Sequence, residues 1–189
     1  MVSASASASD SPADGRNPGM PLDLDWVRSV QANLSAIERR AATIPGRRSV
    51  KKEWQAAWYV RAITCMDLTT LAGDDTDGRV RRLCAKARFP VRGDILEALG
   101  AQELGITTAA ICVYHHFIET ARRALEGSKV QVCAVSTGFP AGLSPFPQKL
   151  AEIKASVAAG AQEIDIVITR SHVLTGQWER LYDEVRAYR

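Results

Sequence analysis

From residue 62 to residue 189 the sequence alternates short apolar runs with amphipathic helical patterns. The apolar runs are typical of buried strands and are AITCMD (62–67), TAAICVY (108–114), VQVCAVST (130–137) and EIDIVIT (163–169). The helical patterns that follow them cover residues 76–87, 117–125, 147–159 and 177–188, and RGDILEALGA adds a helix before the second run. Strands that alternate with such helices predict βαβ units around a parallel sheet. The units could form a small doubly wound sheet or half of an eight-stranded barrel, and the alternation alone does not choose between them.

The first sixty residues are organised differently. Residues 1–20 alternate Ser and Ala and then contain Asp, Pro, Gly and Asn, a composition typical of disorder because it buries too little apolar surface. Apolar residues then recur at helical spacing, as in Trp26, Val30, Leu34 and Ile37. Residues 44–46 (Ile-Pro-Gly) predict a break, and a second helical pattern covers about residues 50–61. We therefore expect a disordered tail (1–20), a helical collar (21–61) and a βα region (62–189).

The overall composition is that of an ordinary globular protein and argues against several kinds of partner. Of the 189 residues 46% are hydrophobic, yet no apolar run reaches the roughly 18 residues of a membrane-spanning helix. The N-terminus lacks the apolar centre of a signal peptide. The net charge of +3 is small, and the only basic cluster is interpreted as a solvated helix start; it contains Arg47, Arg48, Lys51 and Lys52. We expect a cytoplasmic protein, with the nucleus as an alternative, that binds neither nucleic acid nor membranes.

No motif predicts a metal site. Adjacent His115 and His116 have no third ligand nearby in the sequence, so a solvated turn is favoured. GDDTDG (73–78) resembles a calcium loop but lacks the later glutamate, and Thr76 suits the N-cap of a helix better. The four cysteines lack C-x-x-C spacing and are interpreted as reduced core thiols; they are Cys65, Cys84, Cys112 and Cys133.

Alternation along the predicted strands separates two faces. In the fourth run, Ile164 and its alternate neighbours would pack under helices, whereas Asp165 and Thr169 share the opposite face. The same parity groups Cys65 with Asp67 in the first run. An ionised carboxylate such as Asp165 is costly to bury alone. We therefore expect this face to have polar neighbours for Asp165, a water-filled cavity or chemistry that uses the acid. The inward face of a barrel near its C-terminal end would accept such a set.

Several motifs, in this order, resemble the deoxyribose-phosphate aldolases of the animal type. They are CMDLTTLAGDDTD (65–77), GITTAAICVY (105–114), STGFPAG (136–142), GAQEIDIVITR (160–170) and LTGQWE (174–179). The resemblance extends from about residue 22 to residue 189 and includes KKEWQAAW in the collar. It implies an α/β fold, the N-terminal half of a (β/α)8 TIM barrel that supplies strands one to four behind a helical collar.

The resemblance also implies a reaction and a set of site residues. The family reversibly cleaves 2-deoxy-D-ribose 5-phosphate to D-glyceraldehyde 3-phosphate and acetaldehyde, in deoxyribonucleotide catabolism. No metal or organic cofactor is expected, because a lysine forms a Schiff base with the substrate and acts as the electron sink. Carried over by motif, Asp165 is the proton donor and acceptor, Asp67 belongs to its proton network, and Thr69 and Cys112 line the substrate site. Cys112 is nevertheless expected to contribute packing rather than chemistry.

The same resemblance predicts that this chain is incomplete as an enzyme. The family's Schiff-base lysine, its helper lysine and its phosphate-binding loops all belong to later strands, beyond residue 189. The six lysines present lie in predicted helices or before a strand; they are Lys51, Lys52, Lys86, Lys129, Lys149 and Lys154. The final LYDEVRAYR also stops inside a helical pattern. We predict an isolated chain that is inactive as an aldolase and that needs the missing barrel half, or a homo-oligomer, as partner for a sugar phosphate substrate.

Other interpretations remain open at this point. Unpaired edges on the first and fourth strands would favour aggregation, so the alternative function is a truncated, non-catalytic product that binds or regulates another chain. A doubly wound binding domain would need a phosphate loop of the G-x-G-x-x-G type, which the sequence lacks. Two departures from the family pattern, at His115–His116 and at Thr169, would loosen the rim of the pocket or be neutral.

Overall fold

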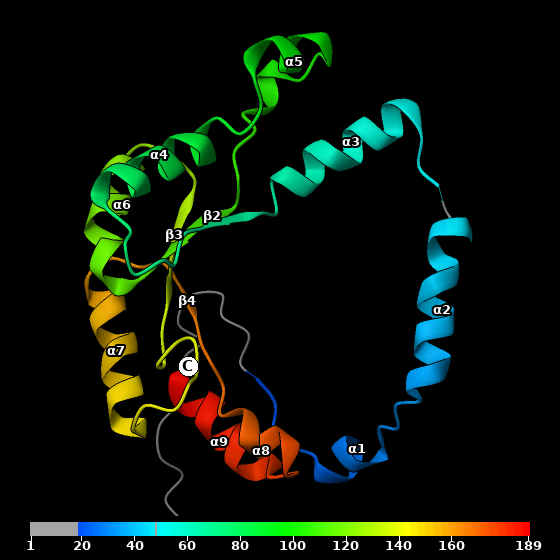
Figure 1. The fold of residues 1–189 in the computed structure, drawn as a ribbon, viewed down its shortest axis with the longest axis vertical. Helices are drawn as coiled ribbons and strands as arrows, with labels where there is room; N and C mark the ends of the chain where they lie inside the picture. Colours follow the sequence, from blue (N-terminus) through cyan, green and yellow to red (C-terminus); the bar gives the residue numbers. More distant parts are fainter. Residues whose placement is uncertain (1–18, 48) are drawn as a thin grey trace, which may run out of the picture. The chain divides into compact units, whose positions relative to one another are not determined.

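The computed structural model describes residues 19–47 and 49–189 (Figure 1). The chain divides into two compact units, Met1–Asn33 and Leu34–Arg189. The tail predicted for residues 1–20 lies outside the described residues except for its last two positions. Within the described residues no helix is long and apolar enough to cross a membrane.

Three helices precede the sheet: α1 (Leu24–Ser29), α2 (Leu34–Arg47) and α3 (Lys52–Ile63). Helix α1 begins after Asp23, whose carboxylate accepts a hydrogen bond of 2.9 Å from the backbone N–H of Trp26. This cap satisfies one of the N–H groups that a helix leaves free at its start.

Two boundaries in this region differ from the prediction. The helical spacing around Val30 is interrupted between α1 and α2, and the break predicted at residues 44–46 lies inside α2. Pro45 occupies the last turn of α2, where the loss of its N–H removes a single helical hydrogen bond instead of ending the helix.

Helix α3 runs further along the chain than predicted. Its backbone hydrogen bonds continue to Thr64, whose N–H donates to the carbonyl of Val60 at 3.3 Å, and strand β1 spans only Asp67–Thr69. The bounds predicted for the first strand, residues 62–67, are therefore wrong: residues 62–66 extend the helix and then turn, and the strand begins at Asp67. As a consequence Cys65 is exposed in the turn; it neither lies in the core nor shares a strand face with Asp67.

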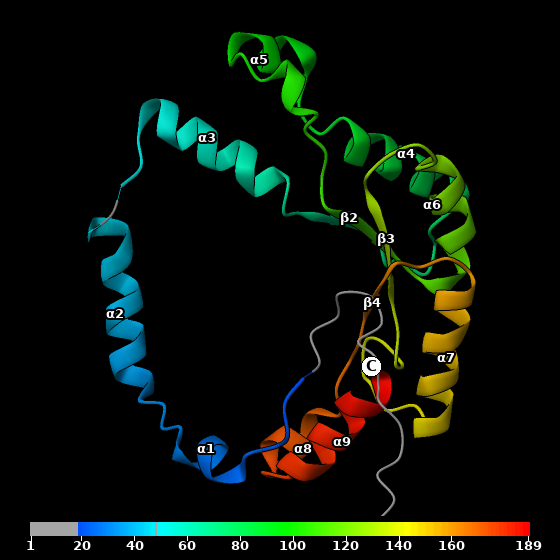
Figure 2. The same ribbon diagram turned by 180° about the vertical axis from the view of Figure 1, so that it is seen from behind.

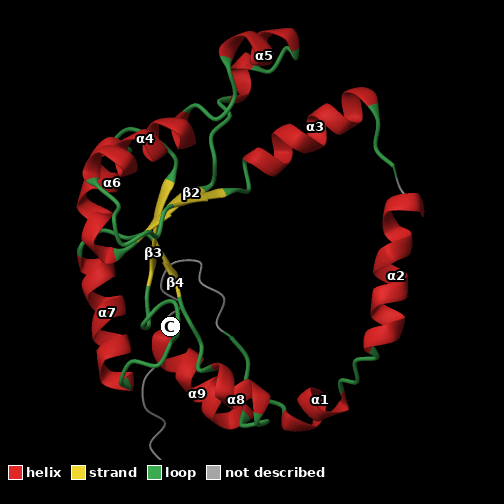
Figure 3. Ribbon diagram, in the orientation of Figure 1, coloured by secondary structure: helices red, strands yellow, loops and turns green. Residues whose placement is uncertain are grey.

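The four strands form one parallel sheet in the order β1-β2-β3-β4 (Figure 3). Strands β2 (Ala110–Val113) and β3 (Gln131–Val135) occupy the centre, and β1 and β4 (Glu163–Asp165) form its edges. The predicted βαβ units and parallel sheet are confirmed. A doubly wound sheet would reverse its strand order and carry helices on both faces, whereas a sequential order is that of consecutive barrel strands.

Helices cover one face of this sheet. Seen from both sides, α4 (Asp77–Arg88), α6 (Ile118–Ala124) and α7 (Phe146–Ala158) follow the strands along the same flank (Figures 1 and 2). Their bounds lie within a residue of those predicted. The side chain of Thr76 accepts a hydrogen bond of 3.3 Å from the N–H of Arg79, which confirms the predicted N-cap of α4.

The principal core lies between these helices and the sheet. Its fully buried members from the strands are Ile111, Val113 and Ala134; Val132 of β3 and Val130, just before β3, are nearly so. The helices contribute Val80, Cys84, Ala87, Ile118 and Ala121. Alternation therefore places every second residue of β2 and β3 in this core, as the sequence predicted.

Shorter elements complete the chain. They are α5 (Gly93–Ala98), the 3-10 turns η1 (Gln102–Leu104) and η2 (His115–Phe117), α8 (Arg170–Leu174) and α9 (Trp178–Tyr188). Helix α8 was not predicted, and it begins at Arg170, directly after the run predicted as the fourth strand (163–169).

The second face of the sheet carries a smaller apolar cluster. It consists of Ala110, Cys112, Cys133 and Val135, with Leu71, Tyr114 and Phe139 packed against them. The edge strands are exposed at alternate positions, which include Asp67 and Asp165, whereas β2 is buried throughout. This face is the one that looks into the interior of a complete barrel, and we call it the inner face.

The principal core should dominate stability. Replacing the wholly buried Ile111 by Ala removes packed methyl groups and leaves a cavity, so we expect a loss of about 3 kcal/mol in the free energy of unfolding. Leu174→Ala, at a side chain that is 85% exposed, serves as the control and should change stability by less than about 0.5 kcal/mol. Urea unfolding monitored by circular dichroism measures both. Equal losses would contradict the assignment of the core.

Candidate active site on the inner face

The inner face presents a carboxylate at the C-terminal end of its last strand. Asp165 ends β4, pairs with Val135 in the ladder, and accepts a hydrogen bond of 2.9 Å at its backbone carbonyl from the N–H of Ser136. Its side chain is exposed, and the thiol of Cys112 donates to its Oδ2 at 3.4 Å. The charge is thus accommodated by exposure on the inner face together with a polar neighbour, as the sequence argument required.

Two thiols lie beneath this carboxylate. Cys112 and Cys133 occupy paired positions of β2 and β3 and are 2% and 1% exposed. Their sulfur atoms and the Asp165 carboxylate all lie within 4.8 Å of one another. The adjacent Cys112 thiol, together with burial, raises the pKa of Cys133, so this group is a neutral thiol at physiological pH.

The other two predicted site residues lie on β1. Thr69 pairs with Cys112 across the ladder, so it lies beside the thiol pair, and its hydroxyl donates to the carbonyl of Asp67 at 3.4 Å. Asp67 pairs with Ala110, at the opposite end of β2 from the level of Asp165. The structure therefore brings Asp165 and Cys112 together with Thr69 nearby, and no hydrogen bond joins Asp67 to Asp165 in the described ranges. The four roles stay predictions.

The loop after β1 is held by a buried carboxylate. Asp75 accepts hydrogen bonds from the Thr70 hydroxyl (2.9 Å) and the Ala72 N–H (3.0 Å), and it pairs with Arg79 at 3.0 Å. Burial opposes ionisation, but these donors together lower the pKa of Asp75. The Asp75 carboxylate thus fixes the conformation of the loop at the edge of the inner face.

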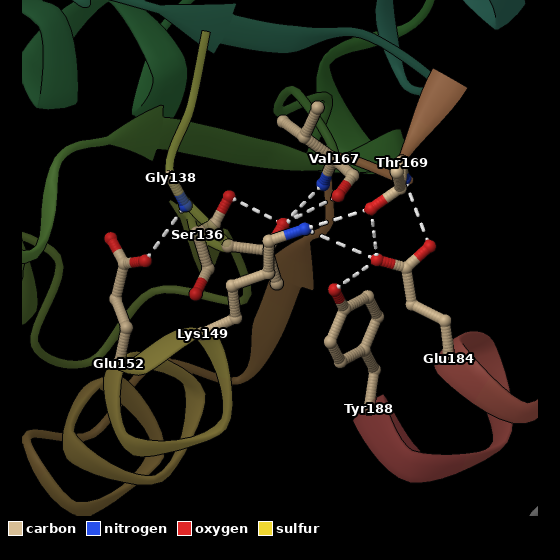
Figure 4. Close-up of polar contacts among 9 residues, drawn as sticks. Ser136, Gly138, Lys149, Glu152, Val167, Thr169, Glu184 and Tyr188 are labelled. Carbon is tan, nitrogen blue, oxygen red and sulfur yellow. Dashed lines mark hydrogen bonds and ion pairs between the residues drawn. The ribbon is translucent and has the colours of Figure 1, made fainter. Parts of the chain in front are cut away.

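The loop after β3 joins the ends of β3 and β4. Thr137 adopts a left-handed backbone (φ 59°), and its hydroxyl accepts a hydrogen bond of 2.5 Å from the N–H of Val167 (Figure 4). Gly142 must lack a side chain, because a Cβ there would lie 2.6 Å from Cγ1 of Val167. Ser136 is fully buried, and its hydroxyl has no hydrogen-bond partner in the described part of the chain.

A buried ion pair lies beside the segment that follows β4 and was not predicted. Lys149 of α7 is 3% exposed, and its Nζ lies 3.1 Å from Oε1 of Glu184 and donates to the Thr169 hydroxyl at 3.0 Å (Figure 4). Glu184 also accepts from the Thr169 N–H (2.9 Å) and from the Tyr188 hydroxyl (2.7 Å). Thr169, noted as a departure from the family pattern, thus caps this network between α7 and α9.

The sequence held one signal for this pair. Lys149, Ile153 and Ser156 form the buried stripe of α7, so a lysine stands on the face of the helix that packs. Charged residues on a buried stripe are rarely left unpaired. The partner itself could not be read from the sequence, because Glu184 lies 35 residues further on.

The ion pair limits what Lys149 can do chemically. Lys149 is 3% exposed, and its Nζ is engaged by the Glu184 carboxylate and the Thr169 hydroxyl, so the amine is not available to attack a substrate carbonyl. Among the residues described, the side-chain partner of Asp165 is a thiol, not a lysine. The inner face therefore offers a carboxylate suited to proton transfer and no nucleophilic amine beside it.

The fold and this face define a class of protein. Sequential parallel strands with helices on one flank are the features of an α/β barrel, here about half of one. No protein-family model matches the chain. Among solved structures, one from Coccidioides immitis, provisionally named a deoxyribose-phosphate aldolase, gives a TM-score of 0.56 at 26% identity and covers 69% of this chain and 45% of that one.

Sequence comparison narrows the class further. The chain is 53% identical to human deoxyribose-phosphate aldolase over 175 residues, which cover 92% of this chain and 55% of the human protein. The mouse protein of the same name is 54% identical over 90% of the chain and 54% of its own length. The structure named "QR15, an Aldolase" gives a TM-score of 0.51 at 25% identity, covering 67% of this chain and 48% of that one. The chain is a homologue of the animal deoxyribose-phosphate aldolases and spans about half the length of the curated relatives it matches.

The buried ion pair yields a stability prediction. Lys149→Met leaves the Glu184 carboxylate buried without its ammonium, so we expect a loss of about 3 kcal/mol in the free energy of unfolding. Lys154→Met, on the same helix but exposed, is the matched control and should be close to neutral. Adding Glu184→Gln to Lys149→Met should recover part of the loss, because no uncompensated charge then remains. Urea unfolding at neutral pH measures all three, and a Lys149→Met variant as stable as the control would disprove the argument.

The same pair predicts how stability depends on pH. Burial alone would raise the pKa of Glu184, but hydrogen bonds from Thr169, Tyr188 and Lys149 lower it from 4.5 to about 2. A folded-state pKa below the unfolded value means that the stabilisation is complete above about pH 4.5 and is lost as the pH falls toward 2. It amounts to at most about 3 kcal/mol.

Unfolding free energies measured from pH 5 to pH 2 test this. The wild type should lose more stability over this interval than Glu184→Gln, which has no carboxylate to protonate. Glu179→Gln, exposed on the same helix, should follow the wild type. Parallel curves for the wild type and Glu184→Gln would show that Glu184 titrates normally.

Proposed function

We propose that this chain is about half of a complete protein and that the complete protein is an aldolase. Its reaction is the reversible cleavage of 2-deoxy-D-ribose 5-phosphate to D-glyceraldehyde 3-phosphate and acetaldehyde, and its substrate class is a sugar phosphate. The observation that carries the proposal is the 53% identity to human deoxyribose-phosphate aldolase over 92% of the chain. A carboxylate at the carboxyl end of β4 supports it, since barrel enzymes place their chemistry there.

Asp165 is the residue that we assign to proton transfer. It is exposed on the inner face, so a substrate in the barrel can reach it, and its only side-chain partner in the described ranges is the weakly donating Cys112 thiol. A carboxylate that is not consumed by an ion pair is free to accept and return a proton. Thr69 contributes to the substrate site from β1, Cys112 lines its floor, and Asp67 extends the proton network lower on the same face.

The chemistry is that of a class I aldolase. A neutral lysine adds to the substrate carbonyl and expels water to form an imine, which takes up the electron pair when the carbon–carbon bond breaks. The lysines of this chain do not meet that requirement. Lys149 is held by Glu184. Of the other five, Lys51 is the N-cap of α3, three lie on helices α3, α4 and α7, and Lys129 lies before strand β3. We therefore propose that the 189-residue chain alone is inactive and that the amine and the phosphate-binding loops come from the remaining half of the barrel.

One observation favours a second function. Strands β1 and β4 are the edges of the sheet, and both are exposed at alternate positions. Exposed edge strands pair readily with another chain. A truncated product that binds or regulates a longer aldolase is the alternative to catalysis.

Reconstitution distinguishes the two. The chain is mixed with a polypeptide that supplies the part of the human aldolase that it does not match, and cleavage of 2-deoxy-D-ribose 5-phosphate is assayed with and without borohydride. Catalysis predicts activity only in the mixture and a borohydride-trapped adduct on the added polypeptide. Binding without catalysis predicts a stable complex that does not turn over. Activity of the chain alone would overturn the assignment of the amine to the other half.

The role of Asp165 has its own test in the active mixture. Asp165→Asn should lower kcat by about 100-fold or more, because general acid–base groups typically contribute that much. Glu163→Gln, on the same strand and face but two residues earlier, is the control and should keep the wild-type rate within about twofold. An Asp165→Asn rate within a few-fold of wild type would remove Asp165 from the mechanism.

A further inference from the structure

We propose that Thr137 is a positioning residue for Asp165 and that it acts through a hydroxyl bridge at the end of the β3–β4 ladder. This inference rests on the proposed function, in which the Asp165 carboxylate transfers protons. Thr137 lies in the loop after β3 and is completely buried, so a substrate in the barrel does not touch it. Its effect on catalysis is therefore exerted through the backbone around Asp165.

The hydrogen bonding between β3 and β4 changes just after Asp165. In a parallel pair, the N–H and C=O groups of one residue bond to two residues of the neighbouring strand that are two positions apart. The N–H of Ser136 donates to the carbonyl of Asp165 at 2.9 Å. The next ladder bond would therefore join the N–H of Val167 to the carbonyl of Ser136. The hydroxyl of Thr137 takes the place of that bond.

The Thr137 hydroxyl lies between these two backbone groups. Its Oγ1 accepts a hydrogen bond of 2.5 Å from the N–H of Val167 and donates to the carbonyl of Ser136 at 2.8 Å (Figure 4). The carbonyl of Val167, at 3.0 Å, is a second acceptor for the same hydroxyl proton. One side chain thus connects the two chain segments at the level where their backbones no longer pair directly.

The backbone of Thr137 is held in a conformation that its own side chain opposes. Its φ is 59°, in the left-handed region that a β-branched residue rarely adopts. A glycine would adopt this angle without strain. Strained backbone persists where the surrounding structure enforces it, and it is concentrated at functional sites. The hydroxyl, and not the backbone conformation, therefore accounts for a threonine at this position.

The bridge restricts the position of Asp165 on the inner face. Asp165 is the last residue of β4, so the ladder holds it only from the preceding side. On the following side, the Thr137 hydroxyl ties Val167 to the end of β3, and Gly142 lies so close to Val167 that a Cβ there would be 2.6 Å from Cγ1. Without the bridge, the segment after Asp165 would separate from β3 and the carboxylate would move. A displacement of about 1 Å is enough to slow a reaction strongly.

The neighbouring Ser136 provides a matched control. Its side chain is also completely buried, but its hydroxyl has no hydrogen-bond partner in the part of the chain that the structure describes. Ser136→Ala therefore removes a buried hydroxyl without breaking a hydrogen bond of that hydroxyl. The substitution also keeps the backbone N–H that donates to Asp165.

The test compares variants in the reconstituted mixture that tests the proposed function. Thr137→Gly removes the bridge and the backbone strain together, so we expect kcat to fall by about tenfold or more while KM stays within about twofold. Thr137→Ser keeps the hydroxyl and Ser136→Ala keeps the bridge, so both should retain kcat within about twofold. The urea midpoint of Thr137→Gly should remain close to that of the wild type, because relief of strain offsets the lost hydrogen bonds.

A double variant shows whether Thr137 acts through Asp165. Adding Thr137→Gly to Asp165→Asn should lower kcat by no more than about twofold, because the group that Thr137 positions is already absent. Losses that multiply would assign Thr137 a role independent of Asp165 and overturn the proposal. A Thr137→Gly variant with the wild-type kcat, or a Thr137→Ser variant as slow as Thr137→Gly, would overturn it as well.

Amide hydrogen exchange in the 189-residue chain alone separates this inference from the proposed function. The N–H of Val167 should exchange about tenfold faster or more in Thr137→Gly than in the wild type, and at the wild-type rate in Ser136→Ala. Faster exchange together with an inactive wild-type mixture would contradict the proposed aldolase while supporting the bridge. Unchanged exchange in Thr137→Gly would show that the hydroxyl does not hold Val167 and would overturn the positioning role.

Discussion

The in-register parallel pairing of β1 to β4 is the constraint on which the rest of the structure depends. Side chains alternate along a strand, so the register decides which residues face the helices and which face inward. The observed register sends Ile111 and Val132 into the principal core and sends Cys112, Cys133 and Asp165 to the inner face. A shift by one residue would exchange the two sets, burying a carboxylate and exposing the core. The same hydrogen bonds that stabilise the sheet thus assemble the candidate site.

Two acids show how differently the chain accommodates charge. Asp165 keeps its exposure to solvent, so it needs few partners and remains available for chemistry. Glu184 is 6% exposed, and Lys149, Thr169 and Tyr188 all donate hydrogen bonds to it. A carboxylate removed from water is stabilised only when its acceptor sites are filled. The network around Glu184 therefore has a structural role, because it fixes the loop that follows β4. The difference in exposure and in hydrogen bonding distinguishes Glu184, a structural acid, from Asp165, a candidate catalytic one.

Local pattern was sufficient for most of the fold, and it failed where two signals overlapped. The alternation of apolar runs with helical patterns predicted the βαβ units, and Thr76 predicted the start of α4. Both features depend on residues that are close in the sequence. Residues 62–67 are apolar enough for a strand, but the first of them continue the helical spacing of α3. The helix therefore extends to Ile63 and shortens the strand. The Lys149–Glu184 pair and the grouping of Cys112 with Cys133 depend on packing and register across many residues, which periodicity cannot supply. The family resemblance found Asp165 but offered nothing on these two clusters.

Covering the sheet and completing the chemistry are separate physical requirements. A partner that continues the barrel must add a parallel strand beyond β4 and another beyond β1. A second copy rotated about the strand direction would do this, since its β1 would lie beside β4 of the first and the two contacts would be equivalent. That copy, however, brings the same six lysines, of which Lys149 is already engaged in the buried ion pair with Glu184. A homodimer would therefore protect the edges and still leave Asp165 without an amine, whereas a different half would satisfy both requirements.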